Sequence, residues 1–265
     1  MWVNDLPVEN SVKCGDLYVP TSGLNTYLKN CIRPVLAEIP DAPVELRGFL
    51  SACGSATLVR ILGIPFICIT KHQLSEDLSF ETALDGIRML SFNANNLIDN
   101  ITFSQVIFVD NQPDEETSDV IFLRTNMLDK NYNLNAPYFL PIRRLTGDDV
   151  DAQFMFVGYP IQDDAFTLTE YGVADGYHAS GIIKDCVVDK NFKTHASHLN
   201  RYSYEAVYNF DEIIDENGLS GGSVFGLKKS NRGFELFHCG IIVRAGNGFV
   251  YAVSTNHLIT VRDKV

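Results

Sequence analysis

The chain has 265 residues, of which 46% are hydrophobic, and its formal net charge is −12 at pH 7. This length and composition suffice for a sizeable core in one large or two small domains, which argues against a disordered protein. The negative charge disfavours the phosphate backbone of a nucleic acid as a partner.

The N-terminal stretch MWVNDLPVENSVKC has no basic segment followed by an apolar run, so it does not resemble a secretory signal. The best apolar stretch, Ile61 to Ile69, has the length of a strand and is shorter than the roughly 18 residues of a membrane span. We therefore expect a cytoplasmic protein without a membrane partner. The six cysteines form no C-x-x-C pair, which favours buried free thiols over a disulfide framework.

The first forty residues differ from the rest of the chain. Apolar residues recur every three or four positions between Leu24 and Ile39, and this spacing predicts an amphipathic helix interrupted near Pro34. We assign residues 1–42 to a partly helical N-terminal extension. Its position makes it a candidate element for binding an activating or inhibiting protein partner.

From Pro43 onward, short runs rich in Val, Ile, Phe, Tyr and Thr alternate with Gly, Asn, Asp and Pro. About ten such runs with little helix between them predict an all-β barrel or sandwich. Residues 76–100 are the exception and fit a long hairpin or a short helix. The segment Asp129 to Ala152 is the least strand-like, so we expect one β-domain over residues 43–140 and another over residues 141–265.

Three residues could together carry acyl transfer, which needs a nucleophile, a base, a carboxylate that orients the base, and donors for the oxyanion. His72 directly follows the apolar run that ends at Thr70, and Asp119 directly precedes the apolar run VIFLRT. Ser220 lies in GLSGGSVF, where the backbone N–H groups of Gly218 and Ser220 are candidate oxyanion donors. Taken alone, that glycine-rich segment is more typical of a structural turn.

The order His72, Asp119, Ser220, with the motifs GSATLV, ITKHQL, SDVIFL, FVGYP, GLSGGSVF and HCGIIV around them, resembles the trypsin-like serine peptidases of chymotrypsin fold. The resemblance covers about Val44 to Ile259. It implies two six-stranded antiparallel β-barrels with the active site between them. It also implies that Ser220 is the nucleophile, His72 the base and Asp119 its orienting acid, with no metal and no organic cofactor.

One residue departs from the secreted members of that family. In members that mature by cleavage, an aspartate precedes the nucleophile and pairs with the newly formed N-terminal ammonium. Here that position is Leu219, which cannot form such a pair. We therefore predict that cleavage of the N-terminus is not the activating event, as in the intracellular and viral members.

Other acidic and histidine residues leave alternatives open. Asp110 and Asp114 follow an apolar run and compete with Asp119 for the third catalytic role. The acids of NFDEIIDENG either favour a basic substrate side chain or form a solvated loop; they are Asp211, Glu212, Asp215 and Glu216.

The pair His195 and His198 has a spacing that could hold a metal if it were helical, with Cys186 or Asp189 nearby. No pattern completes a set of four ligands, so a solvated loop is the preferred interpretation. His178, His238 and His257 show no partner pattern.

The sequence thus predicts a cytoplasmic serine endopeptidase that acts on a protein or peptide substrate. The alternative is a catalytically silent trypsin-like protein that serves as a peptide-binding or scaffold module. A further alternative is a β-barrel binding protein in which the Ser220 turn is only structural.

Overall fold

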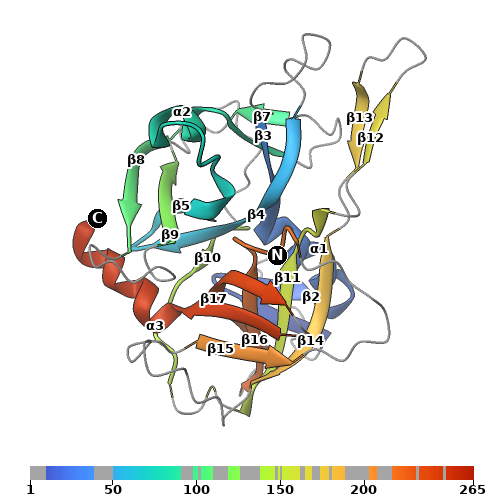
Figure 1. Cartoon of the computed structure of the whole chain (residues 1–265). Coiled ribbons are helices and arrows are strands. Elements are labelled where there is room, and N and C mark those ends of the chain that lie inside the picture. The colour runs from blue at the N-terminus through green and yellow to red at the C-terminus, as the bar shows by residue number, and fades with distance from the viewer. Residues whose placement is uncertain are drawn as a thin grey trace, which may run out of the picture.

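The computed structural model describes residues 10–38, 50–90, 98–100, 103–109, 119–125, 138–146, 149, 151–161, 165–168, 174–178, 181–188, 203–207, 217–230, 233–246 and 249–265. Strands dominate these ranges, and they form two curled sheets and a separate hairpin. The predicted all-β fold with two β-units is confirmed. The first sheet occupies the upper part of Figure 1 and the second sheet the lower part.

The first sheet follows the order β7-β6-β3-β4-β5-β9-β8, and every pair along this path is antiparallel. A short strand, β10, adds in parallel to β4. The bounds are β3 Ile32–Glu38, β4 Leu50–Ile61, β5 Ile64–Thr70, β6 Ile87–Leu90, β7 Ile98–Asn100, β8 Phe103–Phe108, β9 Val120–Thr125 and β10 Leu140–Pro141. The helix α2 (Phe80–Asp85) lies between β5 and β6 in the chain, within the segment where a hairpin or short helix was expected.

The second sheet contains a closed ring of six strands. Its order is β16-β11-β14-β15-β18-β17, and β16 also pairs with β17, as the predicted six-stranded barrel requires. The bounds are β11 Gln153–Gly158, β14 Ile182–Val188, β15 Ser203–Val207, β16 Ser223–Ser230, β17 Gly233–Gly246 and β18 Phe249–Ser254. A hairpin of β12 (Ala165–Leu168) and β13 (Ala174–His178) stands apart from both sheets in Figure 1.

The segment 11–38 is built into both sheets. Strands β1 (Ser11–Cys14) and β2 (Leu17–Pro20) form a hairpin, and β1 pairs in parallel with β17. After a 3-10 turn at Thr21–Gly23, the helix α1 (Leu24–Cys31) buries Tyr27, Leu28 and Cys31 in a core shared with the second sheet. The chain enters the first sheet at Ile32, inside the segment assigned to the N-terminal extension.

The predicted helix over residues 24–39 is therefore wrong in its second half, because α1 ends at Cys31 and β3 follows directly. Pro34 explains the end, since a proline disfavours helical backbone at the preceding residue and has no N–H to donate. The apolar spacing continues because β3 is buried, with Ile32, Val35 and Leu36 all at 0% exposure.

A shared core joins the two sheets. One cluster combines Phe66 and Cys68 of β5 with Ile241 of β17 and with the C-terminal residues Leu258 and Val261. The last two belong to the helix α3 (Thr255–Leu258) and the 3-10 helix that follows it (Ile259–Lys264). The C-terminal segment thus packs the two halves against each other.

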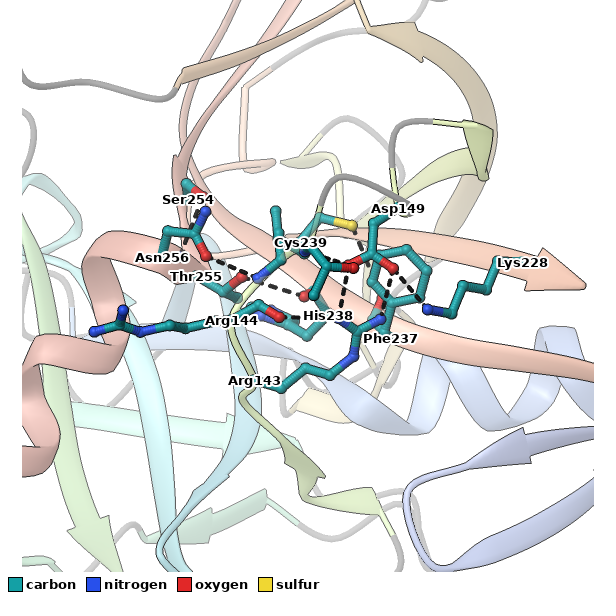
Figure 2. Close-up of polar contacts among 12 residues, drawn as sticks. Arg143, Arg144, Asp149, Lys228, Phe237, His238, Cys239, Ser254, Thr255 and Asn256 are labelled. Atoms are coloured by element: carbon teal, nitrogen blue, oxygen red, sulfur yellow. Dashed lines mark hydrogen bonds and ion pairs between the residues drawn. The ribbon is translucent and has the colours of Figure 1, made fainter. Parts of the chain in front are cut away.

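A network of charged side chains fixes the connection between the two sheets (Figure 2). The Asp149 carboxylate accepts hydrogen bonds from both terminal nitrogens of Arg143, at 2.7 and 3.0 Å, and from Lys228 Nζ at 2.8 Å. The Arg143 guanidinium lies 4.3 Å from the Phe237 ring centroid. Burial by itself would raise the pKa of Asp149, but these donors outweigh burial and lower the pKa well below its usual value.

No helix in the described ranges is both long enough and apolar enough to cross a membrane. The six cysteines all lie in these ranges as free thiols, and five of them are buried, which agrees with the sequence-based expectation.

Candidate active site

The pairing of β5 with β9 brings His72 and Asp119 together. Thr70 at the end of β5 pairs with Val120 at the start of β9, so the residues just beyond these two ends lie side by side. His72 Nδ1 and Asp119 Oδ2 are 2.6 Å apart. The other carboxylate oxygen of Asp119 accepts a hydrogen bond from the His72 backbone N–H at 3.0 Å.

This contact determines where His72 carries its proton. The Asp119 carboxylate can only accept, so neutral His72 donates from Nδ1 and keeps the lone pair on Nε2. The Asp119 side chain is 14% exposed and that of His72 is 46% exposed. A partly buried acid thus orients an imidazole whose other nitrogen remains able to accept a proton from a partner.

Ser220 lies in a tight turn that directly precedes β16 in the chain. Its neighbours Gly218 and Gly221 have φ values of +91° and +80°, which side chains with a Cβ rarely adopt. A Cβ on Gly221 would also lie 1.9 Å from the Ser55 carbonyl oxygen. Leu219 is fully buried in the core of the second barrel, packed against Gly158, so an apolar side chain anchors the turn.

Every carbonyl oxygen from Asn217 to Gly222 accepts a hydrogen bond. The Asn217 oxygen accepts from the Ile161 N–H at 2.9 Å, the Gly218 oxygen from the Ser55 hydroxyl at 2.8 Å, and the Leu219 oxygen from the Gly222 N–H at 2.9 Å. The Ser220 oxygen accepts from both the Ser55 N–H at 2.8 Å and the Gln73 side-chain amide at 2.7 Å. The Gly221 oxygen accepts from the Thr57 hydroxyl at 2.7 Å, and the Gly222 oxygen from the Ile242 N–H at 2.8 Å. The orientation of each peptide plane in the turn is thus fixed through its oxygen.

Among the described residues, three N–H groups in this turn have no acceptor: those of Gly218, Leu219 and Ser220. Two of them, on Gly218 and Ser220, are the candidate oxyanion donors. In a trans peptide the N–H points away from the carbonyl of the same plane. Both N–H groups therefore point away from the donors that hold the Asn217 and Leu219 oxygens, and they are available to an anionic oxygen.

Gln73 links the segment that carries His72 to the turn that carries Ser220. Its Nε2 donates to the Ser220 carbonyl oxygen at 2.7 Å and to the Ser55 carbonyl oxygen at 2.9 Å. Its Oε1 accepts from the Thr70 N–H at 2.9 Å. The side chain fills the space beside Gly54, where a Cβ would lie 2.0 Å from Nε2. No sequence pattern indicated this role of Gln73 beyond its position next to His72.

The Ser220 hydroxyl makes no hydrogen bond to His72 in the described part of this structure. Its Oγ donates to the Val243 carbonyl oxygen at 3.4 Å, and no hydrogen bond joins the two side chains in the part of the chain that is described. The structure therefore joins His72 to Asp119 directly, and joins the His72 segment to the Ser220 turn through Gln73.

Several alternatives from the sequence lie outside the described residues. They are Asp110, Asp114, Asp189, His195, His198, Asp211, Glu212, Asp215 and Glu216. Cys186 is described and lies buried in the core of the second barrel. Within the described ranges, no group of three or more His, Cys, Asp or Glu side chains is arranged to hold a metal ion.

No family model and no curated protein matches the chain. Solved structures match it over most of its length. The scabies mite inactivated protease paralogue S-I1 matches with a TM-score of 0.49 and 11% identity, over 90% of this chain and 95% of the other.

Two further structures are similar to a comparable extent. The protease Anisep from Arthrobacter nicotinovorans matches with a TM-score of 0.46 and 12% identity, over 93% of this chain and 91% of the other. The thermostable serine protease AL20 from an extremophilic microorganism matches with a TM-score of 0.48 and 10% identity, over 89% of this chain and 98% of the other.

Proposed function

We propose that this protein is a cytoplasmic serine endopeptidase whose nucleophile is Ser220. The observation that carries the proposal is the 2.6 Å contact between His72 Nδ1 and Asp119 Oδ2, which leaves His72 Nε2 as a proton acceptor. A turn with open N–H groups at Gly218 and Ser220 lies in the same molecule, linked to the His72 segment by Gln73. A base, its orienting acid and two oxyanion donors are the groups that acyl transfer requires.

In the proposed reaction, Ser220 Oγ attacks the carbonyl carbon of the scissile peptide bond while His72 Nε2 takes the hydroxyl proton. The carbonyl oxygen becomes an oxyanion that accepts hydrogen bonds from the Gly218 and Ser220 N–H groups. His72 then gives its proton to the leaving amine as the C–N bond breaks, which leaves an acyl ester on Ser220. Water repeats the two steps with His72 as base, releases the acid and regenerates Ser220.

The environment of Leu219 supports the proposal that no N-terminal cleavage activates the enzyme. Leu219 is 0% exposed and packs in the core beside Phe154 and Phe156. An apolar anchor of this kind holds the turn without an ion pair, so the folded chain needs no new ammonium group. The free thiols support the proposed cytoplasmic location.

We also propose that the N-terminal segment binds an activating or inhibiting protein. The burial of α1 restricts which part of the segment such a protein can contact. Because Tyr27, Leu28 and Cys31 belong to the core, the apolar face of this helix is not free to bind another protein. A partner would instead meet the β1–β2 hairpin, where Leu17 and Tyr18 are exposed.

A second candidate function, a silent peptide-binding module, is favoured by one observation. Ser220 Oγ donates to the Val243 carbonyl rather than to His72, as expected of a serine that is not poised as a nucleophile. The two candidates differ in whether Ser220 reacts.

A fluorophosphonate probe tests the proposal, because it bonds covalently to an activated serine. We expect labelling of the wild type at Ser220, seen as a modified peptide by mass spectrometry, and its loss in Ser220→Ala and His72→Ala. The matched control is Ser51→Ala, at an exposed serine of β4, which should label like the wild type. With a cleavable peptide, kcat/KM of His72→Ala should fall by about a thousandfold or more. Folded wild-type protein that binds peptides without labelling or cleavage would contradict the proposal and favour the silent module.

A further inference from the structure

A buried chain of hydrogen bonds begins at His238 on β17 and ends in the Ser220 turn. His238 Nε2 lies 2.6 Å from Ser223 Oγ, which lies 2.9 Å from Thr57 Oγ1. Thr57 Oγ1 lies 2.7 Å from the Gly221 carbonyl oxygen. The exposed fractions of His238, Ser223 and Thr57 are 0%, 0% and 1%, so no bulk water competes for these contacts.

The direction of each hydrogen bond follows from counting hydrogens. The Gly221 carbonyl oxygen can only accept, so Thr57 must donate its single hydroxyl hydrogen to that oxygen. Ser223 must then donate its single hydrogen to Thr57. Ser223 has no second hydrogen for its contact with His238, so His238 Nε2 must carry the hydrogen and donate it to Ser223 Oγ. This is the one arrangement that gives each of the three contacts one hydrogen.

The surroundings of His238 agree with this assignment. Among the described residues, His238 Nδ1 is buried with no hydrogen-bond partner, so a second hydrogen there would have no acceptor. Burial lowers the pKa of His238 to about 3. The neutral ring, with its hydrogen on Nε2, is therefore the form that this site accommodates. The Phe225 ring, 5.5 Å away in an edge-on arrangement, closes the site with an apolar contact.

The chain continues through the backbone of the turn. The peptide plane that carries the Gly221 oxygen also carries the Gly222 N–H, which donates to the Leu219 oxygen at 2.9 Å. The plane that carries the Leu219 oxygen also carries the Ser220 N–H, one of the two proposed oxyanion donors. Every link from His238 to the Ser220 N–H therefore accepts at one end and donates at the other, in the same direction.

We propose that His238 is a positioning residue that strengthens the Ser220 N–H as an oxyanion donor through Ser223 and Thr57. Hydrogen bonds aligned in one direction polarise one another, and an amide whose oxygen accepts a strong hydrogen bond donates more strongly from its N–H. The effect reaches the substrate only when charge develops on the carbonyl oxygen, so it lowers the barrier of acylation without tightening substrate binding. The inference rests on the proposed role of Ser220 as the nucleophile.

The decisive comparison is Thr57→Val against Thr57→Ser. Valine retains the branched shape but breaks the chain at its last side chain, whereas serine keeps the hydroxyl. We expect Thr57→Val to lower kcat for a peptide ester about tenfold or more with KM unchanged, and Thr57→Ser to retain most of the wild-type kcat. His238→Phe, which keeps a ring but removes the first donor, should give a smaller loss of kcat. Equal kcat values for Thr57→Val and Thr57→Ser, or a change in KM alone, would overturn the inference.

Two NMR measurements test the chain without any activity. The ring nitrogens of His238 should show the hydrogen on Nε2 at neutral pH, and a hydrogen on Nδ1 would overturn the inference. The Ser220 amide proton should move upfield in Thr57→Val and stay near its wild-type position in Thr57→Ser; equal positions would count against it. If the wild type proves inactive while these signals behave as expected, the proposed function fails and the hydrogen-bond chain stands.

Discussion

Replacing Gln73 by methionine should weaken both the fold and the site, because this side chain makes three hydrogen bonds at a position only 5% exposed. Methionine has a similar length and no amide. The Ser220 oxygen would keep its hydrogen bond from the Ser55 N–H, but the Thr70 N–H and the Ser55 oxygen would lose the bonds that Gln73 provides.

The size of the effect follows from these two groups. Each buried polar group left without a partner costs about 1–3 kcal/mol, so Gln73→Met should lower the free energy of unfolding by about 2–4 kcal/mol after partial compensation by the apolar methionine. The link between the His72 segment and the Ser220 turn is lost as well. We therefore expect kcat for peptide cleavage to fall more than the loss of folded protein explains.

Denaturant unfolding measures the first effect, and the rate of fluorophosphonate labelling of fully folded protein measures the second. Gln153→Met is the matched control, because Gln153 is exposed on β11 and its loss should change stability by no more than about 0.5 kcal/mol. Gln73→Glu keeps the acceptor for Thr70 but places a carboxylate against two carbonyl oxygens, so it should be worse than methionine at neutral pH. If Gln73→Met matched Gln153→Met in both assays, the role of Gln73 as a link would be refuted.

Three further outcomes follow from the same contacts. Leu219→Ala should lower the free energy of unfolding by about 2–5 kcal/mol, read from denaturant midpoints, because it empties a fully buried position; a midpoint equal to that of the wild type would contradict the anchoring role. Gly54→Ala should displace Gln73, since the new Cβ would lie 2.0 Å from Nε2, and a wild-type labelling rate would argue against this. Because burial lowers the pKa of His238 from 6.5 to about 3, unfolding takes up a proton below pH 6.5. Stability should therefore be fully present above that pH and fall by up to about 5 kcal/mol towards pH 3, and a His238→Gln variant that keeps the same slope would contradict the assignment.

The local patterns of the sequence predicted the part of the site that depends on strand ends. His72 follows β5 and Asp119 precedes β9, so the antiparallel pairing of these strands alone brings the two residues together. The apolar run before His72 and the one after Asp119 already indicated both strands. The same holds for the turn at Ser220, where glycines on either side provide the positive φ values.

What the sequence could not predict depends on contacts between residues far apart in the chain. Thr57 and Ser223 are 166 positions apart, and no local periodicity indicates such a pair. The parallel pairing of β1 with β17 is hidden for the same reason, so residues 11–38 were assigned to an extension although they complete both sheets. The interruption of the helix near Pro34 was predicted, but the helix expected after it is a strand, because the buried residues of β3 continue the apolar spacing.

The donors that hold the Ser220 turn come mainly from the first sheet, although the turn itself belongs to the second. Ser55 and Thr57 lie on β4, and Gln73 follows β5. The same hydrogen bonds therefore dock the two sheets and shape the proposed oxyanion site, so the second sheet does not hold that turn by its own contacts alone. The shared core around Phe66 and Ile241 also holds the two sheets together. We accordingly expect one cooperative unfolding transition, with fluorophosphonate labelling lost at the denaturant concentration where tyrosine circular dichroism is lost. Labelling lost at a clearly lower denaturant concentration would mean that the hydrogen bonds from Ser55, Thr57 and Gln73 are not what holds the turn in its shape.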